Sequence, residues 1–222
     1  MRDVPIKNTE ILEALNNFLW YYDNRDFVKK NLVLHGSASE RDRWTNSKYR
    51  DEIIAMDEKH EGFPDSCHSY ALKADRLVHI NPQSSESAEF VSRYSEYNEK
   101  LCQLLSTRNN ALTQMYPPNG YISWHNNANA SAYNIIFSWS ETGDGLFKYV
   151  DGHTGEEVVM KDVKGWQCKA GYFGAYSEPW YKRVYHAAET DCWRITVSYM
   201  FDRTDISMGL QDDIIEEIMS DF

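Results

Sequence analysis

The stretch YISWHNNANASAYNIIFSW, residues 121–139, places a histidine and several asparagines directly before an alternating apolar sequence. His125 and Asn127 are two residues apart, and an extended chain points such a pair to the same face. A metal site would use a histidine and a carboxylate at this spacing, whereas this chain offers an amide. The stretch is therefore a metal site, a modified metal site or the polar end of a strand.

A second histidine and an arginine follow about sixty residues later in the sequence. His186 lies in VYHAA, and Arg194 comes eight residues after it, in WRITVSYMF. In an extended strand Arg194, Thr196 and Ser198 share one face, and the other face is apolar. An unpaired buried guanidinium is costly, so an arginine in a β core must find an anion. Arg194 has a hydroxyl residue two positions later on the same face, and this arrangement is suited to bind a carboxylate. A salt bridge on an exposed strand face would satisfy the arginine equally well.

The secondary-structure elements that would position these residues include helices in the first half of the chain and one at its end. Apolar residues recur at helical spacing in TEILEALNNFLWYY, where Thr9 is the expected N-cap, and a charged helix is predicted in SKYRDEIIAMDEK. The longest helix is predicted in SSESAEFVSRYSEYNEKLCQLLSTRNN, capped by Ser84 or Ser85, and a strand-like RLVHI precedes it. A final amphipathic helix is predicted in DISMGLQDDIIEEIMSDF, with three residues facing inward: Ile214, Ile215 and Ile218.

The pattern changes to β structure from about residue 111. Short segments rich in β-branched and aromatic residues are separated by Gly, Pro, Asn or Asp: NIIFSWS, GLFKYVD, EEVVMKDV, AGYFGAYS and WRITVSYMF. We therefore predict one α+β domain over residues 1–222. Residues 1–110 would form mainly helical support, residues 111–201 a sandwich-like or barrel-like β core, and residues 202–222 a C-terminal helix.

Composition excludes several classes of function. A net charge of -11 and a pI near 5.1 argue against a protein that coats nucleic acid. No apolar run reaches the roughly 20 residues of a membrane helix, so we expect no membrane partner. The four cysteines are far apart and lack CxxC spacing, which predicts free thiols and a cytoplasmic location.

The ordered set of residues resembles the Fe(II)/2-oxoglutarate-dependent oxygenases, and within them the prolyl-4-hydroxylase-like branch. That family presents His-x-Asp on one strand, a distal His fifty or more residues later, and then Arg-x-Ser or Arg-x-Thr. This chain reads WHNN, VYHAA and WRITVS in the same order. QMYPPNGYISWHNN and GDGLFKYVDGHTGEEVV are also similar to the family's approach to the first ligand and to its following hairpin, and small phage-encoded members carry similar strings. The resemblance covers residues 111–201.

The resemblance implies a double-stranded β-helix core, of the jelly-roll or cupin-like type, with N-terminal supporting helices. It implies that His125, Asn127 and His186 are the catalytic residues and hold Fe(II). The activity implied is that of a dioxygenase, a hydroxylase that couples 2-oxoglutarate decarboxylation to oxidation of a substrate C–H bond. The substrate would be a small molecule or a peptide or protein side chain, and not nucleic acid.

The co-substrate site follows from the same resemblance. Arg194, Thr196 and Tyr116 would hold the far carboxylate of 2-oxoglutarate, and the family also admits ascorbate as an accessory cofactor. Two rivals stay open: a catalytically degenerate β-helix protein used for binding or structure, and a cupin-like metalloprotein of different chemistry.

The chain departs from the family at the carboxylate ligand, which is replaced by Asn127. The amide oxygen could bind the metal weakly, or the side chain could stand off and leave the position to water or halide, as in halogenating members. In a third interpretation the site is degenerate. A bulge could exchange Asn127 with Asn126 or Asn129, and Asp144 or Asp151 could supply a carboxylate if they are not simply turn residues.

Two further acidic residues lie close after His186. Glu189 and Asp191 could fix the tautomer of that histidine as hydrogen-bond acceptors, or they could be exposed loop acids.

Overall fold

The computed structural model describes residues 1–72, 85–107, 110–201, 206 and 208–221. The strand expected in RLVHI and the capping Ser84 lie outside the described residues. The four cysteines are free, as predicted. No helix in the described ranges is long and apolar enough to cross a membrane.

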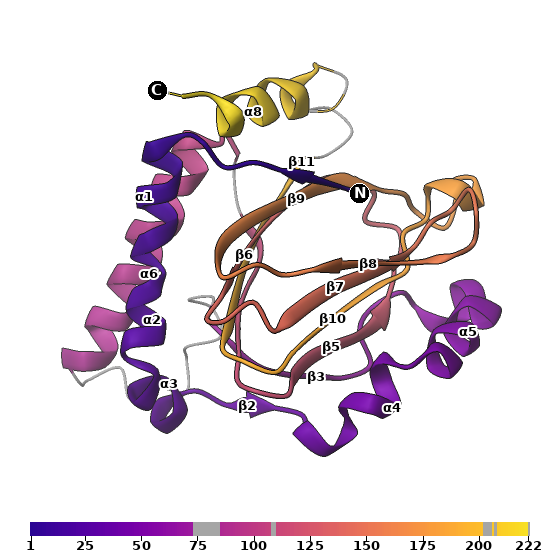
Figure 1. Ribbon diagram of the computed structural model, residues 1–222, viewed down its shortest axis with the longest axis horizontal. Helices are drawn as coiled ribbons and strands as arrows, with labels where there is room; N and C mark the ends of the chain where they lie inside the picture. The colour runs from indigo at the N-terminus through magenta and orange to yellow at the C-terminus, as the bar shows by residue number, and fades with distance from the viewer. Residues whose placement is uncertain (73–84, 108–109, 202–205, 207, 222) are drawn as a thin grey trace.

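Eight antiparallel strands form two facing sheets, shown in Figure 1. One sheet has the order β9-β6-β11-β4 and the other has the order β5-β10-β7-β8. This alternation of successive strands between two sheets is the order of a double-stranded β-helix, or jelly roll, and confirms the predicted fold class. The bounds are β4 (Asn110–Tyr116), β5 (Gly120–His125), β6 (Ala132–Ser140), β7 (Gly145–Val150), β8 (Glu157–Lys161), β9 (Gly165–Phe173), β10 (His186–Thr190) and β11 (Arg194–Phe201).

Three short strands from the N-terminal half extend this core. β1 (Arg2–Val4) pairs with β9, and β2 (Leu34–His35) pairs with β3. β3 (Cys67–Ala71) pairs with both β4 and β5, so it joins the two sheets along one side. The division of the whole chain into one domain stays a prediction, but its N-terminal half is part of the sheets as well as their support.

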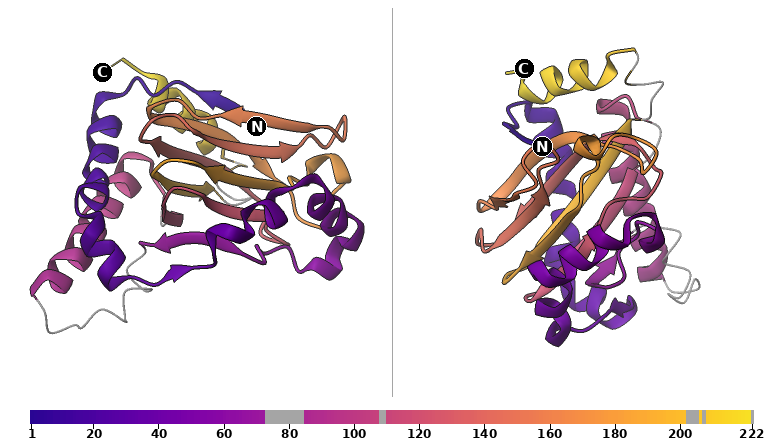
Figure 2. Two further views of the ribbon diagram at one scale, coloured as in Figure 1. Left: turned by 60° about the horizontal axis from the view of Figure 1, so that its bottom comes forward. Right: turned by 90° about the vertical axis from the view of Figure 1, so that its right-hand side faces the viewer.

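Helices cover the outer face of the first sheet, where α1 and α6 run side by side (Figures 1 and 2). The apolar residues of α1, α6 and α8 form one buried core with the outward side chains of β6, β9 and β11. Ile214, Ile215 and Ile218 are buried in this core, as predicted. The bounds are α1 (Thr9–Asn17), α2 (Leu19–Asp23), α3 (Arg25–Asn31), α6 (Ser85–Leu104) and α8 (Leu210–Met219).

A second helical group covers the outer face of the other sheet. Trp124 of β5 is fully buried there, and its indole N–H donates a hydrogen bond to the Thr45 carbonyl at 3.0 Å. The group consists of η1 (Ala38–Glu40), α4 (Arg41–Thr45), α5 (Ser47–Met56) and η2 (Asp57–His60), and a separate short helix, η4 (Trp180–Lys182), precedes β10. The two groups leave the inner faces of both sheets to line the interior of the barrel.

The period-two alternation of β11 divides its side chains as predicted. Ile195, Val197 and Tyr199 are fully buried against the helices, whereas Arg194 and Thr196 are buried on the opposite, interior face. The same strand therefore supplies both the apolar core and the polar interior.

The start of α1 is capped by a residue other than the one expected. The prediction of Thr9 as N-cap was wrong: the Asn8 side-chain oxygen accepts the Ile11 N–H at 3.0 Å. The Asn8 amide also donates to Glu217 of α8 at 2.7 Å, and its backbone N–H donates to the Ile218 carbonyl at 3.2 Å. Asn8 therefore joins two helices that are far apart in the sequence.

We predict that Asn8→Ala lowers the free energy of unfolding by about 1 kcal/mol, because it removes an N-cap, and by more if the bond to Glu217 contributes. Urea denaturation measures the change. Asn17→Ala, an exposed position at the other end of α1, is the control and should leave stability within about 0.5 kcal/mol. Equal stabilities of the two variants would contradict the capping role.

Candidate metal centre

Two histidines face each other inside the barrel. His125 ends β5 and His186 begins β10, and strand pairing places them directly opposite one another. Their ring centroids are 4.1 Å apart, and both side chains are buried. His125 Nδ1 lies 2.8 Å from the Ser123 carbonyl oxygen, and His186 Nδ1 lies 2.9 Å from that of Val184. A carbonyl only accepts, so each Nδ1 carries the proton and each Nε2 keeps its lone pair.

Both imidazoles are neutral at pH 7. Burial lowers the pKa of His125 to about 4, and burial followed by the nearby His125 lowers the pKa of His186 well below its usual range. Phe147 and Phe173 flank the His186 ring, with centroids 5.7 and 4.8 Å away. Metal ligation requires neutral imidazole, and this apolar surrounding keeps both rings in that form.

The asparagine-rich segment is a tight turn and does not continue the strand. β5 ends at His125, and Asn127 has a left-handed backbone with φ of 68°, its N–H donating to the Gly62 carbonyl at 2.7 Å. The premise that an extended chain points His125 and Asn127 to one face was therefore wrong. Asn126 is buried and caps the turn through its side-chain oxygen, and Asn129 is exposed. A metal-ligating role for Asn127 stays a prediction.

The two aspartates considered as substitutes are turn residues. Asp144 accepts the Thr142 hydroxyl at 2.7 Å, and Asp151 accepts the N–H groups of His153 and Thr154 at 2.9 and 3.0 Å. Within the described ranges, no group of three His, Cys, Asp or Glu side chains is placed to hold a metal. The residues present thus fit two of the three protein ligands expected for a facial iron site.

The acidic residues after His186 have other partners. Glu189 accepts the Lys148 ammonium at 2.9 Å, and Asp191 pairs with Arg41. The suggestion that these acids fix the tautomer of His186 was wrong, because a backbone carbonyl accepts its Nδ1–H.

Arg194 finds its anion inside the protein, at the opposite end of the barrel from the histidines. Its Nε donates to Asp162 Oδ2 at 2.7 Å, and its Nη1 and Nη2 donate to Thr196 and Ser138 at 2.5 and 2.9 Å. The Lys169 ammonium lies 3.4 Å from the other oxygen of Asp162. All three ionic groups are buried, so the prediction that Arg194 needs an anion is confirmed, and that anion is Asp162.

The charges in this cluster perturb one another. Burial alone would lower the pKa of Arg194, but the Asp162 carboxylate outweighs it and raises that pKa. Both cations lower the pKa of Asp162 against the effect of burial. Burial, reinforced by Arg194, lowers the pKa of Lys169 in spite of Asp162. The carboxylate lies closer to Arg194, at 2.7 Å, than to Lys169, at 3.4 Å.

Asp162 and Lys169 were missed by sequence reasoning. Asp162 follows a strand and looks like an ordinary turn residue in MKDVKG. Lys169 stands between Cys168 and Ala170, which face the helices, so strict alternation of β9 was the signal that could have placed Lys169 inside.

Tyr116 connects the two ends of the interior. Its hydroxyl donates to Gln114 Oε1 at 2.5 Å, and the Arg194 guanidinium carbon lies 5.8 Å from its ring centroid. Tyr116 belongs to the same buried apolar cluster as Phe147 and Phe173, which contact His186. The structure therefore brings five of the predicted residues to one shared interior and leaves Asn127 in the turn after β5, although it does not test their roles. The five are His125, His186, Tyr116, Arg194 and Thr196.

A polar region that sequence reasoning missed adjoins His125. Four buried atoms there make no hydrogen bond of ordinary geometry within the described residues: His60 Nδ1, Asn126 Nδ2, Tyr176 Oη and Tyr185 Oη. Asn126 lies close to both tyrosines, because burial raises the pKa of each tyrosine and the Asn126 side chain lowers it. His60 lies near His125 and contributes to the lowered pKa of that histidine. The surroundings of the centre are thus apolar beside His186 and polar beside His125.

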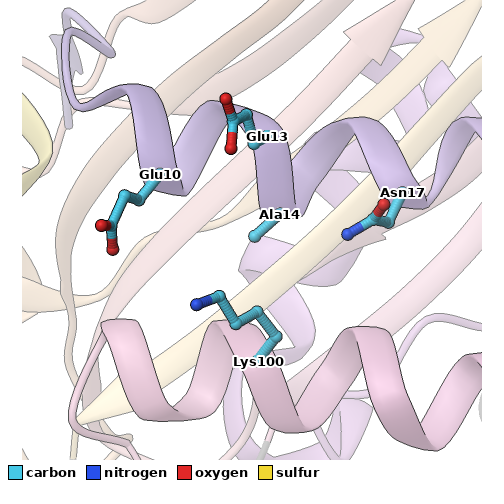
Figure 3. A pocket seen from close by; sticks show the side chains of 5 residues that line it. All are labelled: Glu10, Glu13, Ala14, Asn17 and Lys100. Atoms are coloured by element: carbon cyan, nitrogen blue, oxygen red, sulfur yellow. The ribbon is translucent and has the colours of Figure 1, made fainter.

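A surface groove lies away from this interior, between α1 and α6 (Figure 3). Its volume is about 300 Å³, and Figure 3 shows Lys100 extending from α6 toward α1. The lining residues are Glu10, Glu13, Ala14, Asn17 and Lys100. None of the candidate site residues lines it.

The fold and the paired imidazoles define the class as a double-stranded β-helix protein with an interior candidate metal centre. The sequence matches none of the protein-family models and none of the curated proteins with which it was compared. Among solved structures, a prolyl hydroxylase in complex with a hypoxia inducible factor oxygen degradation domain peptide, from Trichoplax adhaerens, has a TM-score of 0.42 and 9% identity over 94% of this chain and 86% of that chain. Vicilin from hazelnut, Corylus avellana, has a TM-score of 0.25 and 12% identity over 77% of this chain and 48% of that chain. Both TM-scores are low, so the fold assignment rests on the strand order.

We predict that stability falls between pH 7 and pH 5 because His125 is buried and neutral. The unfolded state binds this proton with a pKa near 6.5, and the folded state binds it with a pKa of about 4. The stabilisation is therefore complete above pH 6.5 and is lost as pH falls toward 4, which removes about 2 kcal/mol by pH 5. Urea denaturation across this range measures it.

The variant His125→Gln should reduce this pH dependence to the part that the buried His186 contributes, whatever its stability at pH 7. His153→Gln, at an exposed position, is the control and should keep the wild-type slope. A wild-type slope in His125→Gln would mean that other groups cause the loss.

Proposed function

We propose that the protein is an Fe(II)- and 2-oxoglutarate-dependent oxygenase that hydroxylates a C–H bond of a small molecule or of a peptide side chain. The observation that supports this most is the pair of facing neutral imidazoles inside a double-stranded β-helix, His125 and His186, each with its Nδ1 bonded to a backbone carbonyl. The buried Arg194 at the start of β11 supports a co-substrate carboxylate site in the same interior.

His125 and His186 would hold the metal, and the third protein position would be filled by the amide oxygen of Asn127 or left to water. Bound Fe(II) would supply the activation of O2 together with the oxidative decarboxylation of 2-oxoglutarate. The chain's own contribution at these ligands is orientation: the carbonyls of Ser123 and Val184 fix both rings in the Nδ1–H tautomer.

The length of β10 supports placing the co-substrate between the histidines and Arg194. His186 and Thr190 are the two ends of β10, and four residues of strand span roughly 13 Å. Arg194 follows β10 at its Thr190 end, so a five-carbon dicarboxylate would lie between the imidazoles and the guanidinium. Arg194, Thr196 and Tyr116 would hold the far carboxylate, and the buried aromatic residues beside His186 would exclude water.

A second candidate function is a binding or structural module without catalysis. Two observations favour it: Asp162 already pairs with Arg194, and the described residues offer no carboxylate beside the two imidazoles. Fe(II)-dependent binding of 2-oxoglutarate distinguishes the two candidates.

We predict that His186→Ala weakens anaerobic binding of Fe(II), and of 2-oxoglutarate in its presence, at least tenfold, because one of two imidazole ligands is lost. Isothermal titration calorimetry measures both affinities. His35→Ala, an exposed position, is the control and should bind both as the wild type does. If the wild type binds 2-oxoglutarate equally well with and without Fe(II), the oxygenase proposal fails and the binding module is favoured.

We predict that Asn127→Asp raises the Fe(II) affinity at least tenfold, because a carboxylate adds a negative charge and a stronger donor at the third position. Asn129→Asp adds the same charge at an exposed position of the same segment and controls for long-range attraction. Equal affinities in the two variants would remove Asn127 from the ligand set.

A further inference from the structure

Four chain segments surround the end of the barrel at which the histidines lie, and we call them the rim. Strand pairing places His186 beside both His125 and Tyr149, so the segments that adjoin these residues lie at one end. The Ser123 N–H donates to the Ser66 carbonyl at 2.9 Å, which holds the segment before β3 at the same end. The rim consists of residues 57–66, 126–131, 151–156 and 174–185.

Contacts between these segments join them into one surface. The Arg183 guanidinium donates to the Asp57 carboxylate at 2.7 Å, and the stacked rings of Tyr181 and His153 have centroids 5.1 Å apart. Gly62 packs against the backbone of the turn after β5. Each segment of the rim is therefore held by another, and the exposed side chains of the rim have a defined arrangement.

The rim carries an excess of negative charge. It contains seven acidic side chains and three lysine or arginine side chains. Two of these cations are paired within the rim, Arg183 with Asp57 and Lys182 with Glu178. One cation, Lys59, is left beside five carboxylates: Glu58, Glu61, Asp65, Asp151 and Glu156.

Charged groups next to the rim do not remove this excess. The N-terminal strand contributes Arg2, Asp3 and the amine of Met1, and together these add a single positive charge. Arg50, beside the start of β8, is already paired with Glu157 at 2.6 Å. A surface with this excess attracts cations and repels nucleic acid and anionic lipid.

Large aromatic side chains are exposed on the same rim. The exposed fractions are 64% for Phe63, 38% for Trp180 and 48% for Tyr181. Phe63 shares its segment with Glu58 and Glu61, which are also exposed. The faces of aromatic rings attract ammonium and guanidinium groups, so rings beside carboxylates suit the side chains of lysine and arginine.

Two hydroxyl groups of the rim have unused hydrogen-bonding capacity. Tyr176 and Tyr185 are buried, and their hydroxyls make no hydrogen bond of ordinary geometry within the described residues. Burial raises the pKa of each tyrosine, and the nearby Asp57 carboxylate raises it further, so both hydroxyls lie close to the charged part of the rim. A peptide segment offers a carbonyl acceptor at each residue, which such hydroxyls reach directly or through water.

We propose that the rim binds an extended basic segment of a protein or peptide, whose lysine or arginine side chains contact Glu58, Glu61 and Phe63. The carboxylates and rings are exposed and spread over three segments of the rim, so they suit a chain with several cations better than one enclosed ion. Taking this segment to be part of the substrate rests on the proposed function. The binding itself requires neither metal nor co-substrate.

The test uses a synthetic peptide of alternating lysine and glycine and the full chain in EDTA, with calorimetry as the measurement. The double variant Glu58→Gln/Glu61→Gln should weaken binding of this peptide at least fivefold. The matched control is Glu10→Gln/Glu13→Gln, which makes the same change of charge at exposed positions of α1 and should bind within twofold of wild type. A peptide with glutamate in place of each lysine should not bind.

A second pair of variants tests the aromatic contact. Phe63→Ala should weaken binding of the lysine peptide at least threefold, because it removes an exposed ring beside the carboxylates. Val163→Ala is the control: Val163 is also an exposed apolar residue, 59% exposed, but it lies in the turn between β8 and β9 at the other end of the barrel. Equal effects of these two variants would overturn the aromatic contact.

The outcomes separate this inference from the oxygenase proposal. Binding of the lysine peptide that is lost in Glu58→Gln/Glu61→Gln, without any Fe(II)-dependent binding of 2-oxoglutarate, supports the basic-segment site and rejects the oxygenase. Fe(II)-dependent binding of 2-oxoglutarate by a wild type that does not bind the lysine peptide overturns the basic-segment site and leaves the oxygenase standing. Equal weakening by the rim and α1 double variants also overturns it, because attraction by the overall negative charge would then explain the binding.

Discussion

The register in which β10 lies between β5 and β7 is the constraint on which the candidate centre depends. It places His186 opposite both His125 and Tyr149. A slip of β10 by one residue would turn His186 to the outer face and would bring Ala187, which shares an outer-face cluster with Trp124, into the interior. Those outer residues pack in an apolar cluster with α4 and α5, so burial beneath the helices holds the register that pairs the imidazoles. Alternate side chains of β5 and β10 therefore pack against the helices on one face and place the two imidazoles in the interior on the other.

The interior is polar at the expense of stability, and the helix-facing core compensates for it. A buried ion cluster contributes little net stability, but removing one partner of a buried pair typically costs 3–5 kcal/mol. The opposite faces of β6, β9 and β11 bury a continuous apolar surface against α1, α6 and α8. This separation of roles within each strand lets the barrel keep Arg194, Asp162 and Lys169 out of water while the fold as a whole stays compact.

Local pattern was enough to predict the features that one strand or helix determines. Alternation in β11 correctly separated Arg194 from Ile195, and the change of pattern near residue 111 correctly indicated that β structure follows the helices. Features that depend on contacts between distant segments could not be predicted. The pairing of Arg194 with Asp162 joins residues 32 positions apart, and the cap of α1 involves a bond across 209 positions to Glu217. Neither partner is marked by its neighbours in the sequence.

Gly62 gives the N-terminal half a part in the centre itself. It has a φ of 77°, and a Cβ built there would lie 2.2 Å from the Ala128 backbone nitrogen and 2.5 Å from Asn126 Oδ1. Its carbonyl also accepts the N–H of Asn127. A shortened chain that began at residue 110 would keep both imidazoles but would lose Gly62, whose backbone packs against the turn beside them. A side chain at position 62 would deform that turn from outside the barrel, so the candidate centre depends on a residue that precedes the β core.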